Sequence, residues 1–318
     1  MISLPTPLLI DTDPGLDDAF AIALALGSPE VDVIGITTVG GNTGLANTTR
    51  NALRLLEFLG RTDIPVASGH DTPYRRPKKE TGYAPVHGLD GFVSVNLPDP
   101  VTALASTDAA AFLAEKIEAS PEPVTLVAIG PLTNIAHLVD RFPEVLPKVG
   151  RFIIMGGAAH LGNVTPVAEF NIWHDPEAAK VVFASALKTV MVGLDVTHSV
   201  KTYESEFDWF ADAGKFGEVF GTMLKHYTDF YSEFYGERMT HQHDALAMAE
   251  AIWPGILELE ETTLDVETKG EITDGMTVID PRDRSGRGRN GWVAWSIDGV
   301  EFHGRLGNAL RKLAEPFS

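Results

Sequence analysis

The chain contains no cysteine among its 318 residues. This absence excludes a disulfide framework, a thiolate metal site and a cysteine nucleophile, and it agrees with a reducing compartment. Long apolar runs are also missing: the longest, Ala19 to Leu26, is far shorter than the roughly 20 residues of a membrane span. The first residues show no basic stretch followed by an apolar segment, so we expect a cytoplasmic protein without a signal peptide.

Positive charge is scarce. The chain has 25 Lys and Arg against 44 Asp and Glu, a formal net charge of −19. This balance argues against a protein that tracks nucleic-acid phosphates, and it suggests a protein that binds cations. Hydrophobic residues make up 44% of the chain, which is enough for a sizeable core and excludes disorder as the main state.

Apolar runs rich in β-branched residues alternate with helical patterns. The expected strands cover residues 7–10, 31–39, 64–67, 124–129, 152–155 and 189–194, and the expected helices cover residues 18–26, 47–59, 132–142 and 176–184. This alternation predicts an α/β fold: a mostly parallel, doubly wound open sheet with helices on both faces. Ligands of such sheets gather at the carboxyl ends of the strands.

Two stretches interrupt this alternation. Residues 69–100 have few apolar runs and many Pro and Gly, which is typical of a long active-site loop. Residues 258–301 contain short alternating runs separated by turn residues and predict a small antiparallel β appendage, followed by a final helix from about Phe302. We expect one domain, residues 1–318, that carries this insertion and this appendage.

Four carboxylates lie between the first strand and the first helix, in the segment Asp11-Thr12-Asp13-Pro14-Gly15-Leu16-Asp17-Asp18. The Pro-Gly turn folds the two pairs toward one another. Converging carboxylates repel unless protons or a cation compensate, and an all-oxygen set suits Ca²⁺ or Mg²⁺. Asp17 and Asp18 also suit the start of a helix, but that role leaves Asp11 and Asp13 unexplained.

This acidic segment resembles the N-terminal signature of the inosine–uridine preferring nucleoside hydrolases. Further motifs similar to those of the family follow in order: Gly41-Asn42, His87-Gly88-Leu89-Asp90-Gly91, Gly130-Pro131-Leu132-Thr133-Asn134, Met155-Gly156-Gly157, Asn163, Glu169-Phe170-Asn171 and His243-Asp244. The resemblance implies an enzyme of nucleoside salvage or catabolism that hydrolyses the N-glycosidic bond of purine or pyrimidine ribonucleosides, releasing free base and ribose. It also implies a homodimer or homotetramer, with no nucleic acid or membrane as partner.

The resemblance implies a bound Ca²⁺, and the flexible oxygen geometry of that ion favours it over Mg²⁺. The implied metal set consists of Asp13, Asp18, Asp244 and the backbone carbonyl of Ile129, with Asp11 as an outer, supporting carboxylate. Taken alone, Asp244 would be interpreted as an acid at a helix start. By the same resemblance, Asp13 is the general base that activates a calcium-bound water, and Asn42 orients that water.

The remaining implied site residues contact substrate. Asn163 and Glu169 match residues that bind the ribose 5′-hydroxyl, Asp17 and Asn171 the 2′-hydroxyl, and Asp244 the 3′-hydroxyl; Met155 belongs to the same implied pocket. Glu169 and Asn171 flank Phe170, so strand-like spacing would point both in one direction.

A histidine is the implied acid that protonates the departing base. His243 is the first candidate, and His241 and His87 are alternatives; His87 is also expected near the base pocket. Tyr227 and Tyr231 share a helix face and are expected to stack on the base, whereas Phe230 and Phe234 are expected to pack in the core.

Two other functions remain open at this point. Asp11-Thr12-Asp13 after a strand also resembles the start of haloacid dehalogenase-type phosphatases, although Gly15 stands where that family has Thr or Val. The second alternative is a nucleoside- or calcium-binding module without turnover. The preferred nucleobase is not evident from the sequence.

Overall fold

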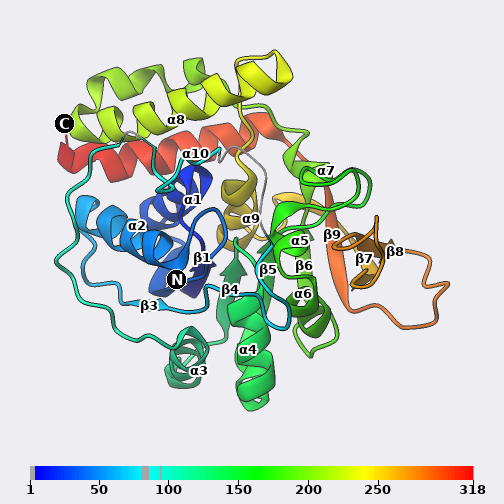
Figure 1. Ribbon diagram of the computed structural model, residues 1–318. Coiled ribbons are helices and arrows are strands. Elements are labelled where there is room, and N and C mark those ends of the chain that lie inside the picture. Colours follow the sequence, from blue (N-terminus) through cyan, green and yellow to red (C-terminus); the bar gives the residue numbers. More distant parts are fainter. Residues whose placement is uncertain (1–3, 80–85, 94, 318) are drawn as a thin grey trace.

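The computed structural model describes residues 4–79, 86–93 and 95–317 and shows a central sheet with helices on both faces (Figure 1). The strands are β1 (Thr6–Thr12), β2 (Val31–Thr38), β3 (Val66–Ser68), β4 (Val124–Ala128), β5 (Val149–Met155), β6 (Thr189–Val192), β7 (Leu257–Val266), β8 (Thr277–Asp280) and β9 (Gly291–Ile297). The α-helices are α1 (Leu16–Gly27), α2 (Leu45–Phe58), α3 (Ala109–Ala119), α4 (Thr133–Arg141), α5 (Phe170–His174), α6 (Pro176–Phe183), α7 (Leu194–Thr197), α8 (Gly214–Tyr235), α9 (His243–Ile252) and α10 (Gly299–Ala314).

The strands are ordered β3-β2-β1-β4-β5-β6-β9-β7-β8. Every neighbouring pair from β3 to β9 is parallel, which confirms the predicted doubly wound sheet. Strand β7 is antiparallel to both β9 and β8, so the predicted antiparallel region at the C-terminal side is also confirmed. It extends the main sheet, however, because β9 pairs with β6 along residues 291–293.

The strand order places a crevice between β1 and β4. From β1 the sheet grows outward through β2 and β3, and from β4 it grows the other way through β5 and β6. Ligands of open α/β sheets bind outside the carboxyl ends of the strands at such a reversal point. The acidic segment follows β1 directly, so the fold brings it to this crevice.

Two apolar cores lie on opposite faces of the sheet. Leu8 and Ile10 of β1 face a core shared with α1, α2, α8, α9 and α10, whereas Leu9 faces a core shared with α3, α4 and α6. Successive residues of a strand point to opposite faces. A strand with apolar residues on both sides is therefore buried on both sides, as parallel sheets require.

The helix and strand boundaries differ from the predictions at several points. Helix α3 was not predicted, although Asp108 caps it by accepting from the Ala111 N–H. Strand β6 ends at Val192, two residues early, because Gly193 is the N-cap of α7. Residues 80–85 and 94 of the predicted 69–100 loop lie outside the described residues, and the described remainder of that loop contains no helix or strand. No described helix is both long and apolar enough to cross a bilayer.

Candidate active site

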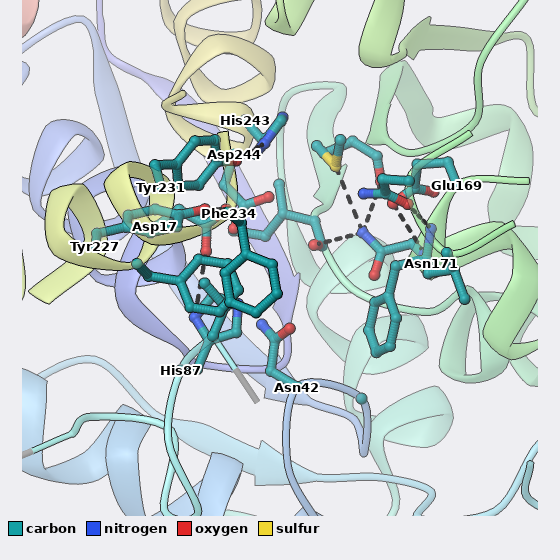
Figure 2. Close-up of a pocket in the computed structure, with 18 of the residues that line it drawn as sticks. Asp17, Asn42, His87, Glu169, Asn171, Tyr227, Tyr231, Phe234, His243 and Asp244 are labelled. Carbon is teal, nitrogen blue, oxygen red and sulfur yellow. Dashed lines mark hydrogen bonds and ion pairs between the residues drawn. The ribbon is translucent and has the colours of Figure 1, made fainter. Parts of the chain in front are cut away.

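A pocket of about 400 Å³ opens at the crevice between β1 and β4 (Figure 2). It collects residues from the ends of β4 and β5, from the loop after β2, from α1, α5, α8 and α9, and from the described parts of the 69–100 loop. Predicted site residues that line it are Asp17, Asn42, His87, Ile129, Met155, Asn163, Glu169, Asn171, Tyr227, Tyr231, His243 and Asp244. The predicted residues Asp11, Asp13 and Asp18 do not line it but are buried nearby.

The acidic side chains converge at the base of the pocket. Carboxylate oxygens of Asp17, Asp18 and Asp244 all lie within 4.8 Å of one another. Asp13 is not part of this trio, but its backbone N–H donates to Asp18 Oδ1 at 3.3 Å. The Asp13 side chain has one oxygen, Oδ2, that accepts from the Asn42 N–H at 2.6 Å. Its other oxygen, Oδ1, is buried and has no hydrogen-bond partner among the described residues.

Local hydrogen bonds explain why Asp18 adopts its position. The Thr12 hydroxyl donates to Asp18 Oδ1, and the Gly15 N–H and Asn42 Nδ2 donate to Oδ2 at 2.8 and 3.1 Å. The Gly15 bond is the one that an acid in the first turn makes with the residue that caps a helix. Asp18 therefore stabilises the start of α1 and also belongs to the acidic cluster.

Asp11 lies one layer behind this cluster. Its Oδ1 accepts from the Thr37 hydroxyl and from Asn134 Nδ2, and its Oδ2 is buried with no partner among the described residues. Asp11 is therefore held by β2 and α4 behind the acidic cluster, and its supporting role stays a prediction.

Burial dominates the electrostatics of these acids. It raises the pKa of Asp17 and Asp18 to about 6 and that of Asp11 to about 7. Burial, reinforced by the neighbouring carboxylates, raises the pKa of Asp13 and Asp244 well above the usual range. No Lys or Arg is found among the described residues that line the pocket.

The donor set therefore fits a hard divalent cation. Buried carboxylates without a cationic neighbour must carry protons or share a cation, and the unpartnered oxygens of Asp13 and Asp17 offer free lone pairs at this point. All of these groups are oxygen ligands. Ca²⁺ and Mg²⁺ bind such ligands by preference, whereas transition metals favour nitrogen and sulfur ligands.

The opposite wall of the pocket carries Glu169 and Asn171, and Figure 2 shows them across from the tyrosines of α8. The expectation of strand-like spacing was wrong: Glu169 caps α5, where its carboxylate accepts from the N–H groups of Asn171 and Ile172. The Gly157 N–H donates a third bond at 2.9 Å. Burial raises the pKa of Glu169 to about 7, against the effect of these three bonds.

Asn171 and Asn163 are fixed by backbone contacts. Asn171 Nδ2 donates to the carbonyls of Ile129 and Met155, at 3.1 and 3.0 Å. Asn163 Oδ1 accepts from the Phe170 N–H at 3.0 Å. Both amides thus orient at the pocket surface through bonds with β-strand ends and the start of α5.

The tyrosines and histidines form a second hydrogen-bonded wall. Tyr227 donates to Asp17 Oδ2 at 3.3 Å, and the Tyr231 hydroxyl lies 3.2 Å from His243 Nε2. His243 Nδ1 lies 2.7 Å from the Thr197 hydroxyl. Burial, followed by neighbouring histidines, lowers the pKa of His243 well below its usual range.

The other two histidine candidates differ in position. His87 lines the pocket, its Nδ1 accepts from the Leu16 N–H at 3.0 Å, and burial lowers its pKa to about 4. Accepting at Nδ1 places the proton of the neutral ring on Nε2. His241 is not among the residues that line the pocket, and its Nδ1 instead lies 2.8 Å from the Val200 carbonyl.

Several pocket residues were not predicted. The expectation that Phe230 and Phe234 belong to the core was wrong for Phe234, which is 59% exposed, and both residues line the pocket. Val86, Val164, Phe170 and Gly41 line it too, whereas Tyr235, which also lines it, was expected there because it shares a helix face with Tyr227 and Tyr231. The helical spacing of α8 carried a signal for the aromatic face, but it could not show which part of that face lies over a cavity.

The comparisons with known proteins agree with this geometry. Residues 8–304 match the family model described as inosine-uridine preferring nucleoside hydrolase. The chain belongs to this family. This membership confirms the predicted activity, hydrolysis of the N-glycosidic bond of ribonucleosides. The alternative of a haloacid dehalogenase-type phosphatase is therefore wrong.

Curated relatives of this chain include the pyrimidine-specific ribonucleoside hydrolase RihA of Citrobacter koseri. The two sequences are 41% identical over 309 residues, which cover 96% of this chain and 97% of that protein. The RihA protein of Salmonella newport is 41% identical over 313 residues, covering 97% and 99%. Because the relatives are named as hydrolases, the module without turnover has no support.

Solved structures are similar over almost the full chain. A plant nucleoside hydrolase has a TM-score of 0.87 at 36% identity and covers 96% of this chain and 99% of its own. A purine-preferring ribonucleoside hydrolase from Gardnerella vaginalis has a TM-score of 0.92 at 30% identity, with coverages of 98% and 100%.

The buried acids predict how stability depends on pH. A carboxylate whose pKa rises on folding stabilises the folded state at low pH, and this contribution is lost as the pH rises through the folded pKa. For Asp17, Asp18 and Asp11, the stabilisation is lost over the range from about pH 4 to about pH 7. We therefore expect the chelated protein to have a lower melting temperature at pH 7.5 than at pH 5, and calcium to raise it more at pH 7.5.

Thermal denaturation with EDTA and with CaCl₂ at the two pH values measures both effects. The variant Asp17→Asn removes one of the titrating groups, so its chelated form should show a weaker dependence on pH. A larger calcium-induced shift at pH 5 than at pH 7.5 would contradict the prediction.

Proposed function

We propose that this enzyme hydrolyses pyrimidine ribonucleosides in preference to purine ribonucleosides. The observation that carries the proposal is the 41% identity, over 96% of the chain, to proteins named as pyrimidine-specific, against 30% identity to the purine-preferring structure. The walls formed by Tyr227, Tyr231 and His87 suit a flat base, because aromatic faces stack on bases.

The cation is proposed to be Ca²⁺, held by Asp13, Asp18, Asp244 and the Ile129 carbonyl. The convergent oxygens of Asp18 and Asp244 support this set. The unpartnered Asp13 Oδ1 has two lone pairs, one for the cation and one for a proton of the water. When bound, such a cation lowers the pKa of a nearby water and offsets the carboxylate repulsion. Asp17 also belongs to the trio, but its Oδ2 accepts from Tyr227, which agrees better with its proposed contact to the 2′-hydroxyl.

The reaction replaces the bond between the anomeric carbon and the base nitrogen with a bond to a water oxygen. Asp13 accepts a proton from that water at Oδ1, because its Oδ2 is already bonded to the Asn42 N–H. Asn42 Nδ2 donates to Asp18, so Asn42 links the general base Asp13 to the cation site. Glu169 and Asn163 hold the 5′-hydroxyl, and Asn171 holds the 2′-hydroxyl.

The departing base must leave with its electrons stabilised. His243 lies between Tyr231 and Thr197, and we propose that it relieves the charge on the base by donating an N–H hydrogen bond. Burial lowers the pKa of this ring, so it is neutral near pH 7 and stabilises the charge on the base by hydrogen bonding. The departing base then takes its proton from solvent.

A panel of uridine, cytidine, inosine and adenosine tests the base preference. We expect kcat/KM for the pyrimidine nucleosides to exceed that for the purine nucleosides by roughly 10–200-fold, the range available from shape differences in a pocket. Release of reducing sugar, measured with and without EDTA, supplies both the preference and the dependence on metal. Equal rates for the two classes would refute the pyrimidine preference but not hydrolysis itself.

Asp13→Asn tests the general base. The amide keeps the shape of the carboxyl group but cannot accept the proton, so we expect kcat to fall by roughly two to four orders of magnitude while the protein remains folded. Glu115→Gln, the same type of change on the exposed side of α3, is the control and should leave kcat unchanged. Near-normal turnover of the Asp13 variant would remove Asp13 from the mechanism.

His243→Ala tests the leaving group. We expect turnover of uridine or inosine to fall on the order of 10²–10⁴-fold, with little loss for p-nitrophenyl riboside, because its phenolate leaves without assistance. Parallel kcat measurements on both substrates decide the point. An equal loss on both would mean that His243 shapes the site instead of assisting the base.

A further inference from the structure

One of the three hydrogen bonds that hold the Glu169 carboxylate comes from outside the start of α5. Two of its three N–H donors, Asn171 and Ile172, are its own neighbours at the start of α5. The third donor is Gly157, from the segment that follows β5. The position of the Glu169 carboxylate relative to the end of β5 is therefore set by whatever holds Gly157 and the next residue, Ala158.

Thr277, the first residue of β8, holds this segment through a single hydroxyl. Thr277 Oγ1 accepts from the Ala158 N–H at 2.8 Å and donates to the Ala158 carbonyl at 2.6 Å. Its side chain is 3% exposed, so water cannot readily replace these bonds. Of the common side chains of similar size, only serine could also donate and accept at one atom here.

Thr277 is also tightly packed against Gly157. Gly157 has a φ of +78°, and a Cβ added to it would lie 2.8 Å from Thr277 Cγ2. One residue before Thr277, Met276 pairs with Ala168 in an antiparallel bridge, immediately before Glu169. The start of β8 thus contacts both segments that meet at the Glu169 carboxylate.

We propose that Thr277 is a positioning residue that fixes Glu169 for recognition of the substrate 5′-hydroxyl. The inference rests on the proposed function, in which Glu169 binds that hydroxyl. Glu169 has two oxygens with about four acceptor positions, and three of these are used by backbone N–H groups. The remaining position can meet the 5′-hydroxyl only while Gly157 is held in place.

The test compares a substrate with its 5′-deoxy analogue. We use the best ribonucleoside of the panel, uridine and 5′-deoxyuridine if pyrimidines are preferred, and measure kcat/KM for each. The wild type should prefer the hydroxylated substrate by on the order of 10²-fold or more, because a site built to bind a hydroxyl rejects the analogue that lacks it. Thr277→Val keeps the branched shape but removes both hydrogen bonds. It should lower kcat/KM for uridine about tenfold, equivalent to about one hydrogen bond, and leave 5′-deoxyuridine within about twofold.

Two variants separate positioning from general destabilisation. Thr277→Ser retains the hydroxyl and should restore the wild-type ratio. Thr263→Val removes a buried hydroxyl of the adjacent strand β7, one that donates to the Gly288 carbonyl; it should lower the melting temperature without changing the ratio. If Thr277→Val does not fold, Thr277→Ala, which removes the same hydroxyl without burying a methyl group against polar atoms, takes its place with the same expected ratio.

The possible results separate the positioning role of Thr277 from the binding of the 5′-hydroxyl by Glu169. A wild-type enzyme with no preference for the 5′-hydroxyl overturns the role of Glu169 and, with it, the role of Thr277. A wild type that discriminates, together with a Thr277→Val variant that loses activity equally on both substrates, overturns the positioning role alone. A ratio that falls in Thr277→Val and returns in Thr277→Ser supports it.

Discussion

The repulsion among buried carboxylates is the constraint on which this structure depends. Asp13, Asp17, Asp18 and Asp244 lie together at the base of one pocket, and the described pocket lining supplies no Lys or Arg to compensate them. Such a cluster persists only if the surrounding fold imposes it. The strand ends and the first turns of α1 and α9 provide that rigid support, so the free energy of burial in the two apolar cores holds the acids together. The same negative charge favours a cation over an anionic ligand at this position.

The parts of the fold and site that follow from local pattern were predictable. The strands of the parallel sheet are short apolar runs, and the acidic segment lies immediately after the first of them, so its place at the carboxyl edge follows from chain order. Asn42 and Ile129 are near strand ends for the same reason. The distant Asp244 was predicted from the family resemblance alone, since its own sequence context indicates only the start of a helix.

The errors arose where tertiary contacts decide the outcome. Glu169 and Asn171 were expected in strand-like spacing, but Glu169 caps the short helix α5, whose five residues carry too weak a periodic pattern to detect. Phe234 has the spacing of a core residue, yet α8 extends beyond the core there and presents the ring at the pocket mouth. The contribution of Thr277 has no local signal, because its partner Ala158 lies 119 positions away in the sequence.

The position of β9 has a consequence for how the chain acquires this pocket during synthesis. The last strand of the chain is not at an edge: it inserts between β6 and β7, and β8 joins the sheet only through β7. Contacts that span a large part of the sequence are slow to form, and the pairing of β9 with β6 cannot form until residues 291–293 have been made. A nascent chain can therefore assemble the six strands from β3 to β6 first and add Asp244 with α9 before β7, β8 and β9 are made. The contact of Thr277 with Ala158 has to wait for those C-terminal strands. The order of synthesis would thus deliver a cation site before a complete substrate site.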